Sequence, residues 1–460
     1  MINLQQKEVI YFIGIGGIGM SALARYFNLV GKQVMGYDRT SSPLTTELEM
    51  EGIPVGFKDS VADLPSVVRM TPKEKVLVVY TPAVPKTHRE LNWFVENDYQ
   101  VEKRSKVLGA ITQDHKTIAV AGTHGKTTTT SLIAHILHDS GHGCNAFLGG
   151  ITANYSSNLI FDQPNAWYVV EADEFDRSFL ALSPDVAVIT SLDADHLDIY
   201  GTPEEMVSAY QQFADLTSED GYRLVCDKAF DQLDRSGVSY GSQAQSTFRA
   251  SDERPENDTY VMDLETPQGT VKSIPLPMPG EHNKENVTAA VAVALHLGVE
   301  HEAIRRSLAT FKGVKRRFEY QQGTGDIVFI DDYAHHPEEL KATIEAAKQR
   351  HPGKRVTGVF QPHLFSRTKD NIDGFARSLE LLDSIFLLDI YPAREEPIPG
   401  VDSQWLLDKI NAPHKKLVDK SALLSELKQD DPEVLLTLGA GDIDRMVEPI
   451  RIMLKEKELQ

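Results

Sequence analysis

The sequence predicts an α/β protein with three consecutive domains, each built around a sheet of mainly parallel strands. Its 460 residues suggest about three domains. Short apolar runs alternate with helical patterns in the first and last thirds, which is typical of parallel strands joined by crossover helices. A glycine-bracketed turn in the middle third lies between an apolar run and a helical pattern, which is the context of a phosphate-binding loop.

The first domain is expected over residues 1–113, with a Rossmann-like fold. Its strands are predicted over 8–13, 33–37 and 75–80, and its first helix over 18–30. A polar break over 113–116 follows and marks its end.

The loop after the first strand follows the pattern of dinucleotide-binding folds. Closely spaced glycines open the helix, and Asp38 ends the next strand about 20 residues further on. A diphosphate can approach backbone N–H groups at such a helix N-terminus. The residues expected to bind it are Gly14, Gly16, Gly17, Ile18 and Gly19. The pattern alone leaves open a nucleotide diphosphate, a nicotinamide cofactor, or a tight turn without a ligand.

The second domain is expected over residues 114–315, with a P-loop ATPase-like fold. Its later strands and its last helix are predicted over 166–172, 185–191, 222–226 and 285–297. The segment 242–278 is polar, has few helix formers and contains β-like pieces, which indicates an antiparallel β insertion.

A phosphate loop is predicted where the apolar run 118–121 enters a glycine-bracketed turn. Val120 stands where the common motif has its first glycine, so this loop is a shorter form. An amphipathic helical run over 131–138 follows. Backbone N–H groups, the Lys126 ammonium and the Thr127 hydroxyl would hold phosphates and Mg²⁺, although a plain helix-capping turn is the alternative. The expected ATP-binding residues are Gly122, Thr123, His124, Gly125, Lys126, Thr127 and Thr128.

Acidic groups and an imidazole follow two further strands of this domain, in segments 171–174 and 193–196. Ligands gather at the carboxyl ends of parallel strands, and Mg²⁺ prefers carboxylate, hydroxyl and water oxygens. Thr127, Glu174 and His196 are therefore the predicted metal ligands. Solvated loop charges are the alternative for any one of them.

The third domain is expected over residues 316–460, beginning within the basic segment 313–318, and is again Rossmann-like. Its strands are predicted over 327–330, 355–360, 384–388 and 433–438. Its helices are predicted to begin at Pro337, near Ser366, at Ser403 and at Asp442.

The charge, the cysteine content and the lengths of the apolar runs exclude several classes of binding partner and of site. The chain has 67 acidic and 47 basic residues, and its formal charge of −20 argues against binding to nucleic acid or an anionic membrane. Its two cysteines, Cys144 and Cys226, provide neither a disulfide framework nor a zinc-site spacing. No apolar run approaches the ~20 residues of a membrane span, and no signal pattern is recognised. We expect a cytoplasmic protein without membrane insertion.

Five motifs identify the family that the chain resembles. In order, they are 122–127 (GTHGKT), 171–174 (EADE), 195–196 (DH), 280–286 (GEHNKEN) and 331–337 (DDYAHHP). Together they resemble the Mur ligases of peptidoglycan synthesis, and the resemblance covers essentially the whole chain. The segments 14–20 (GIGGIGM), 174–180 (EFDRSFL) and 360–368 (FQPHLFSRT) are most similar to the members that add L-alanine to UDP-N-acetylmuramate.

The resemblance implies an ATP-dependent, amide-forming ligase. ATP would phosphorylate the muramoyl carboxylate, and the amino group of L-alanine would attack the acyl phosphate. The implied catalytic residues are Lys126, Glu174, His196 and Arg367, with two Mg²⁺ ions. Asn283, Asn286 and Arg317 would contact ATP, with Arg316 beside Arg317. Thr81 and Arg104 would join the glycine loop at the UDP-sugar. Tyr333, His335, His363 and Arg367 would hold L-alanine, whereas His336 is expected to be a structural residue at a helix start.

Some family features are absent, and some alternatives remain. The carbamylated lysine of several Mur ligases has no counterpart, because residues 197–216 contain no lysine. A recycling ligase that adds a murein tripeptide to UDP-N-acetylmuramate is the nearest alternative. An NAD-dependent oxidoreductase and a P-loop switch that hydrolyses ATP are alternatives from other classes. Either a monomer or a homodimer is compatible with the sequence.

Overall fold

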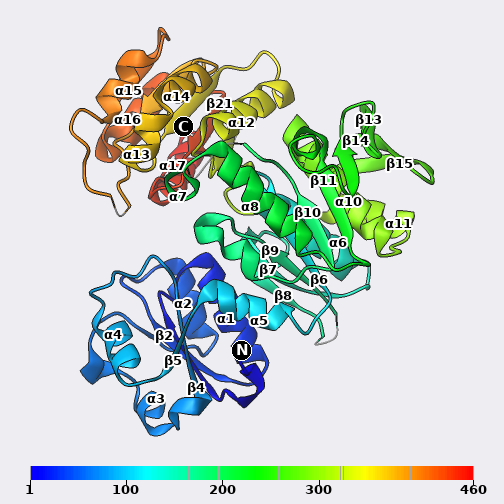
Figure 1. Ribbon diagram of the computed structural model, residues 1–460. Coiled ribbons are helices and arrows are strands. Elements are labelled where there is room, and N and C mark those ends of the chain that lie inside the picture. The colour runs from blue at the N-terminus through cyan, green and yellow to red at the C-terminus, as the bar shows by residue number, and fades with distance from the viewer. Residues whose placement is uncertain are drawn as a thin grey trace. The chain divides into compact units, whose positions relative to one another are not determined.

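The computed structural model describes residues 2–163, 166–193, 197–256, 259–321, 323–324, 326–393 and 395–458. It divides into two compact units. The first comprises Met1–Leu276 and Glu285–Lys312, and the second comprises Pro277–Lys284 and Gly313–Gln460. Three sheets carry the described strands, two of them in the first unit and one in the second (Figure 1). The α/β class with three sheets, as predicted from the sequence, is therefore confirmed. The domain boundaries at 113/114 and 315/316 stay predictions.

The first sheet is parallel throughout, with the strand order β3-β2-β1-β4-β5. Its strands are β1 (Val9–Ile13), β2 (Gln33–Tyr37), β3 (Val55–Gly56), β4 (Val76–Tyr80) and β5 (Gln100–Lys103). Its helices are α1 (Ile18–Leu29), α2 (Pro43–Met50), α3 (Ser66–Met70), α4 (Arg89–Glu96) and α5 (Arg104–Thr112). The central strand β1 is buried along its whole length, and the predicted strands match β1, β2 and β4 to within one residue.

The second sheet has ten strands in the order β15-β14-β13-β12-β11-β10-β6-β9-β7-β8. Its first six are β6 (Thr117–Ala121), β7 (Cys144–Thr152), β8 (Ser157–Phe161), β9 (Trp167–Glu171), β10 (Val186–Ile189) and β11 (Tyr222–Cys226). The rest are β12 (Val238–Gly241), β13 (Phe248–Glu256), β14 (Thr259–Thr266) and β15 (Gly269–Leu276). The predicted antiparallel insertion is present as β13–β15, and it extends the parallel part of the sheet through β12.

The helices of this part of the chain are α6 (Lys126–Asp139), α7 (Leu197–Tyr200), α8 (Pro203–Asp215), α9 (Asp227–Phe230), α10 (Glu281–His296) and α11 (His301–Thr310). Helix α1 from the first sheet lies beside β7 and β8 (Figure 1). There the Arg25 side chain, only 5% exposed, donates to Asn158, and Asn158 donates to the carbonyl of Ile18. The first two sheets therefore share an interface inside one unit.

The amphipathic pattern predicted for residues 131–138 implies a helix with one solvent-facing side, and this prediction was wrong. In α6 every residue from Thr127 to Leu137 is buried, because the helix packs against β7, β9 and α11. Its polar side chains are satisfied internally: Thr130 donates to the Lys126 carbonyl, and His135 contacts the Ser307 carbonyl. A polar residue on this helix therefore does not mark a solvent-facing side.

The third sheet has the order β16-β17-β21-β18-β19-β20 and is parallel except for β16. Its strands are β16 (Glu319–Tyr320), β17 (Val328–Asp332), β18 (Val356–Phe360), β19 (Ser384–Leu387), β20 (Lys415–Leu417) and β21 (Val434–Leu438). The helices are α12 (Pro337–Arg350), α13 (Phe365–Asp370), α14 (Ile372–Leu379), α15 (Ser403–Lys409), α16 (Lys420–Asp430) and α17 (Asp444–Glu458). Two hydrophobic clusters form the core of this unit.

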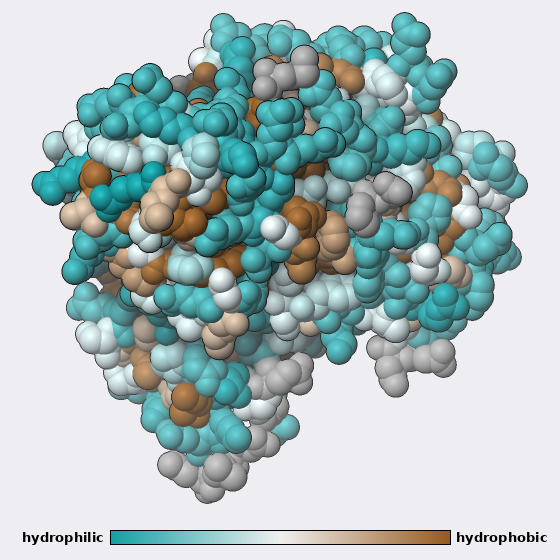
Figure 2. All heavy atoms as spheres, turned by 90° about the horizontal axis from the view of Figure 1, so that it is seen from below, coloured by the Kyte–Doolittle hydropathy of each residue, from teal (hydrophilic) through white to brown (hydrophobic). Residues whose placement is uncertain are grey.

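Hydrophilic residues predominate on the face shown in Figure 2. Among the described residues, no helix combines the length and apolar character that a membrane crossing requires.

Helix α4 carries a buried carboxyl group that contacts the first sheet. Glu90 in α4 is only 2% exposed and accepts a hydrogen bond of 2.8 Å from the Tyr11 hydroxyl in β1. Burial raises the pKa of Glu90 to about 7, although the hydrogen bond from Tyr11 lowers it. The folded protein therefore favours the protonated form of this side chain.

We expect Glu90→Gln to stabilise the protein in a pH-dependent way. Because the pKa of Glu90 is raised in the folded state, its stabilising contribution is complete below the unfolded value near 4.5 and is lost as pH rises through about 7. The variant should therefore melt at a higher temperature than the wild type at pH 8 and at nearly the same temperature at pH 4.5. Calorimetric melting at both pH values tests this. Glu96→Gln, on the exposed side of α4, is the control, and a pH-independent difference would contradict the prediction.

Candidate active site

The predicted phosphate loop lies at the carboxyl end of β6, between that strand and α6. Gly122 and Gly125 have φ angles of 141° and 80°, which side-chain-bearing residues rarely adopt. A Cβ on Gly122 would also lie 2.0 Å from Oγ1 of Thr190. Both glycines are therefore required by the backbone itself, and α6 begins directly after them at Lys126.

The Lys126 side chain folds back over this loop. Its Nζ donates to the carbonyl oxygens of Gly122 at 2.5 Å and Thr123 at 3.3 Å, and it pairs with Oε1 of Glu174 at 2.8 Å. Burial lowers the pKa of Lys126, but nearby carboxylates, Glu174 first, outweigh it and raise the pKa overall. The ammonium thus remains charged at the place where outer phosphates are expected.

The acidic segment after β9 faces the start of α6. The Thr127 hydroxyl donates to Oε1 of Glu171 at 3.1 Å, and Oε2 of Glu171 accepts the Gly149 N–H at 3.1 Å. Glu174 is buried and contacts Lys126 rather than Thr127 in this structure. Two carboxylates and a hydroxyl therefore meet near the loop, which is a donor set that suits Mg²⁺. His196, the other predicted ligand, lies outside the described residues.

Two residues that the sequence analysis did not select hold the loop from the next strand. The Ser191 hydroxyl accepts the His124 N–H at 2.8 Å and lies 2.8 Å from Oγ1 of Thr123, while Thr190 bonds to the His124 carbonyl. The signal was present, because these two polar residues end the predicted strand 185–191, directly after the apolar run Val186–Ile189 of β10. Thr128 is buried in the first turn of α6.

The two asparagines that were predicted to contact ATP have different surroundings. Oδ1 of Asn286 accepts from the Thr129 hydroxyl at 3.1 Å and lies 2.6 Å from where a Cβ of Gly125 would be. Asn286 thus lies against the phosphate loop within the first unit. Asn283, in the second unit, donates from Nδ2 to the Pro279 carbonyl at 2.7 Å.

The glycine loop of the first sheet brings together most of its predicted residues. Oδ2 of Asp38 accepts the Gly16 N–H at 2.8 Å. A Cβ on Gly14 would lie 2.9 Å from the Thr81 methyl group, and a Cβ on Gly19 would lie 3.0 Å from Nη1 of Arg104. Gly17 precedes α1, which begins at Ile18. The loop, Asp38, Thr81 and Arg104 therefore form one cluster at the carboxyl ends of β1, β2 and β4.

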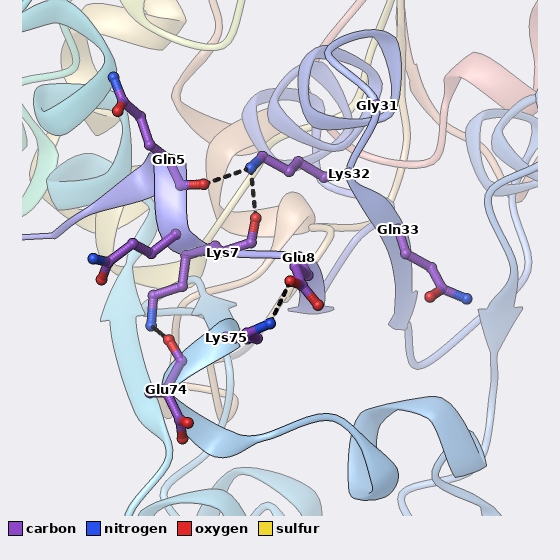
Figure 3. Close-up of a pocket in the computed structure, with 9 residues that line it drawn as sticks. Gln5, Lys7, Glu8, Gly31, Lys32, Gln33, Glu74 and Lys75 are labelled. Atoms are coloured by element: carbon purple, nitrogen blue, oxygen red, sulfur yellow. Dashed lines mark hydrogen bonds and ion pairs between the residues drawn. The ribbon is translucent and has the colours of Figure 1, made fainter.

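A surface cavity of about 610 Å³ lies at the other end of the same sheet (Figure 3). Three lysines line it, but protein oxygens already hold their ammonium groups. Lys7 donates to the carbonyls of Glu74 and Val76, Lys32 donates to two further carbonyls, and Lys75 pairs with a carboxylate. These lysines connect the N-terminal ends of the strands to neighbouring segments. Because protein oxygens already bind their ammonium groups, we do not propose a ligand for this cavity.

The predicted amino-acid pocket forms a cluster in the second unit. The His335 ring lies 5.2 Å from that of Tyr333 and 6.1 Å from that of His363, and Nδ1 of His335 lies 2.9 Å from the Tyr333 carbonyl. Burial, with a smaller contribution from the positive charge of Arg367, lowers the pKa of His335 to about 4, although the Glu339 carboxylate raises it. His335 is therefore neutral at physiological pH, with the Arg367 guanidinium close enough to influence it.

The neighbouring arginines have distinct roles in this cluster. Arg316 is bound to Oδ2 of Asp331 at 3.1 Å and to the Gly439 carbonyl at 2.6 Å, so it fastens the sheet together. Both guanidiniums lie over the Tyr333 ring, that of Arg316 at 5.1 Å and that of Arg317 at 5.2 Å, and Arg317 has Glu339 at 3.9 Å. Arg317 is therefore better placed than Arg316 to face a ligand.

The residues that directly precede α12 and α13 form the rest of the cluster. His336 caps α12 by accepting the Glu338 N–H, as expected for a structural histidine. Leu364 precedes α13 with a φ of 73°, a strained conformation for a residue with a side chain. Its N–H donates to the carbonyl of Tyr391, whose ring stacks on His363 at 5.8 Å. Sequence reasoning missed Tyr391, which follows the predicted strand 384–388 in a loop.

Comparisons with known proteins cover almost the whole chain. Residues 9–116 match the Mur ligase family catalytic domain, residues 120–294 the Mur ligase middle domain, and residues 316–441 the Mur ligase glutamate ligase domain. The chain is similar to UDP-N-acetylmuramate–L-alanine ligase of Flavobacterium johnsoniae, with 50% identity over 99% of this chain and 100% of that one. The corresponding ligase of Parabacteroides distasonis is 46% identical over 98% of each chain.

Two solved structures extend the comparison. The UDP-N-acetylmuramate–alanine ligase of Thermotoga maritima has a TM-score of 0.82 and 27% identity, covering 97% of this chain and 99% of that chain. A murein peptide ligase of Psychrobacter arcticus has a TM-score of 0.69 and 22% identity over 97% and 99% of the two chains, a likeness of fold alone.

Proposed function

Because this chain belongs to the Mur ligase family, we propose that it joins L-alanine to the carboxylate of UDP-N-acetylmuramate with the cleavage of ATP. The observation that carries this proposal is the 50% identity to an enzyme of that name over the full length of both chains. The reaction belongs to the synthesis of peptidoglycan precursors. Its nucleotide substrates lead us to expect it in the cytoplasm.

The chemistry requires activation of a poor electrophile. A carboxylate oxygen of the sugar nucleotide attacks the γ-phosphorus of ATP, and ADP leaves. The amino group of L-alanine then attacks the acyl carbon, the amide bond forms, and inorganic phosphate leaves while the amine loses a proton. Transfer between two anions needs alignment and neutralisation of charge rather than a covalent protein intermediate.

The phosphate loop supports the ATP half of this proposal. Lys126 would neutralise the outer phosphates, and its pairing with Glu174 fixes it at the loop. Thr127 and Glu174, with Glu171 beside Thr127, would hold Mg²⁺, and His196 would hold a second ion. Bound Mg²⁺ supplies neutralisation of phosphate charge. Asn283, Asn286 and Arg317 are the further residues that we propose for contact with ATP.

The glycine-loop cluster would bind the UDP-sugar. Its N–H groups lie at the N-terminus of α1, which favours an anion. Arg104 adds a guanidinium that suits a diphosphate, and Thr81 and Asp38 line the same loop. We prefer a UDP-sugar to NAD at this loop, because an NAD-dependent reaction would not explain Lys126 or the acidic segment 171–174.

The cluster in the second unit would bind L-alanine. Arg367 offers a bidentate partner for the amino-acid carboxylate. A neutral His335 does not repel the substrate's ammonium group. Tyr333 and His363 would supply the walls. We prefer L-alanine to a murein tripeptide because the full-length relatives reported above are named for L-alanine.

We expect phosphate release only when Mg²⁺, ATP, UDP-N-acetylmuramate and L-alanine are present together. Without the sugar nucleotide, no carboxylate is available to accept the γ-phosphoryl group. A phosphate-release assay with each component omitted in turn is the test, and replacement of L-alanine by the tripeptide examines the recycling alternative. Substantial release without the sugar nucleotide would support a P-loop switch instead.

A further inference from the structure

The loop that follows β9 is held by two adjacent cations from the first sheet. Oδ2 of Asp173 pairs with Nη2 of Arg104 at 3.0 Å, and Oδ2 of Asp176 pairs with Nζ of Lys103 at 2.6 Å. Lys103 ends β5 and Arg104 begins α5, so both cations belong to the glycine-loop domain. These ion pairs link the two nucleotide sites within the first unit.

The backbone of the same loop is strained. Asp176 and Arg177 have φ angles of 54° and 53°, two consecutive side-chain-bearing residues in the left-handed region. Such conformations persist only where the surroundings hold them, and they are concentrated at sites that switch. The Tyr200 hydroxyl donates to the Glu174 carbonyl at 2.6 Å on the other side. The loop is thus held by contacts that could be exchanged.

Arg104 contacts the glycine loop as well as Asp173. A Cβ on Gly19 would lie 3.0 Å from Nη1 and 3.2 Å from Cδ of Arg104. The guanidinium therefore lies at the first turn of α1, where the diphosphate is expected. A small cavity of about 10 Å³ is lined by Arg104, Glu171 and Asp173. The Arg104 guanidinium therefore pairs with the Asp173 carboxylate and also borders the glycine loop where we expect the diphosphate.

We propose that Arg104 exchanges partners: it pairs with Asp173 in the free protein, and the diphosphate of the bound sugar nucleotide takes over its guanidinium and releases Asp173. This inference rests on the proposed function. Asp173 is a positioning residue in this scheme. It keeps Arg104 at the entrance of the sugar-nucleotide site and reports occupancy of that site to the phosphate loop.

Release of the Asp173 carboxylate would also change the electrostatic environment of the proposed ATP site. Asp173 directly precedes Glu174, whose Oε1 pairs with Nζ of Lys126 at 2.8 Å. A change at Asp173 therefore occurs one residue away from the ion pair at the phosphate loop. Its release from Arg104 adds uncompensated negative charge near the expected Mg²⁺ ligands. Sugar-nucleotide binding should then strengthen the binding of Mg²⁺ with nucleotide, and by linkage the reverse should hold.

Asp173→Asn provides the test, because the amide keeps the hydrogen bond that Oδ1 of Asp173 accepts from the Phe175 N–H. The variant frees Arg104 in advance. Titration calorimetry with UDP-N-acetylmuramate, without ATP, should show binding about two- to fivefold tighter than in the wild type, as expected for loss of one competing exposed ion pair. Asp173→Glu should restore the wild-type affinity.

Asp176→Asn is the matched control. It also removes one negative charge from the loop, but it leaves the Arg104 pair in place, so its affinity for the sugar nucleotide should equal that of the wild type. A second readout is the affinity for a non-hydrolysable ATP analogue with Mg²⁺. UDP-N-acetylmuramate should raise this affinity in the wild type and should raise it less in Asp173→Asn.

The outcomes separate this inference from the proposed function. Equal sugar-nucleotide affinity in wild type and Asp173→Asn would overturn the partner exchange. Equal tightening in both Asn variants would overturn it too, because loss of loop charge would then explain the effect. Absence of UDP-N-acetylmuramate binding in every form, with unchanged melting temperatures, would instead refute the proposed function.

Discussion

Replacing Lys126 by alanine is expected to abolish turnover while UDP-N-acetylmuramate still binds. The ammonium contacts two carbonyls of the phosphate loop and Glu174, so it lies where we propose that the outer phosphates of ATP bind. Loss of one such electrostatic group costs about 10²–10³-fold in rate. The glycine loop that would hold the sugar nucleotide belongs to a different sheet. Phosphate release and titration calorimetry with UDP-N-acetylmuramate measure the two effects.

Controls separate this chemistry from damage to the fold. Removal of Lys126 takes away an ion-pair partner of the buried Glu174 carboxylate, which costs about 3–5 kcal/mol of stability. A double variant with Lys126→Met and Glu174→Gln removes both charges together and should be inactive but stable. Lys272→Ala, on an exposed part of β15, should keep full activity. Loss of sugar-nucleotide binding in stable Lys126 variants would contradict the two-site arrangement.

Replacing Arg367 by alanine should raise the KM for L-alanine by about 30-fold or more, with a much smaller change for ATP. Loss of one partner from a buried, hydrogen-bonded charge pair costs about 2–5 kcal/mol. The guanidinium lies close enough to His335 to lower the pKa of that ring, and His335 belongs to the same cluster as Tyr333 and His363. Steady-state kinetics with each substrate varied in turn tests this expectation.

Two variants of the same helix support the interpretation. Arg367→Lys keeps the charge but loses the fork of donors, so it should recover only part of the alanine affinity. Lys369→Ala, exposed two residues further along α13, should behave like the wild type. An alanine dependence that is unchanged in Arg367→Ala would remove this residue from the pocket.

Much of the fold could be predicted because buried parallel strands are continuous apolar runs. β1, β2 and β11 were located to within a residue on that basis. β5 was missed because its sequence, Gln100–Lys103, is polar and half-buried at a sheet edge. The α6 helix was found, but its burial was not, since hydroxyl groups that bond within the protein resemble a solvent-facing side in a sequence.

The candidate site was predictable where local spacing determines geometry. The phosphate loop and the glycine loop both need glycines in fixed positions, and Gly14, Gly122 and Gly125 have positive φ angles that favour glycine. Contacts between distant segments carry no such signature. The Thr127–Glu171 pair, the hydroxyls of Thr190 and Ser191 and the Arg104–Asp173 pair depend on how strands are ordered in the sheet. The metal and substrate roles of these residues stay predictions.

Because α6 is buried, the phosphate loop loses its conformational entropy during folding and not when a ligand binds. Because the helix is buried from Thr127 to Leu137, the loop that precedes it is already ordered when the chain folds. A triphosphate that binds at this loop, as we propose, would meet a preformed cradle, so its binding energy would not be consumed in arranging the backbone around it.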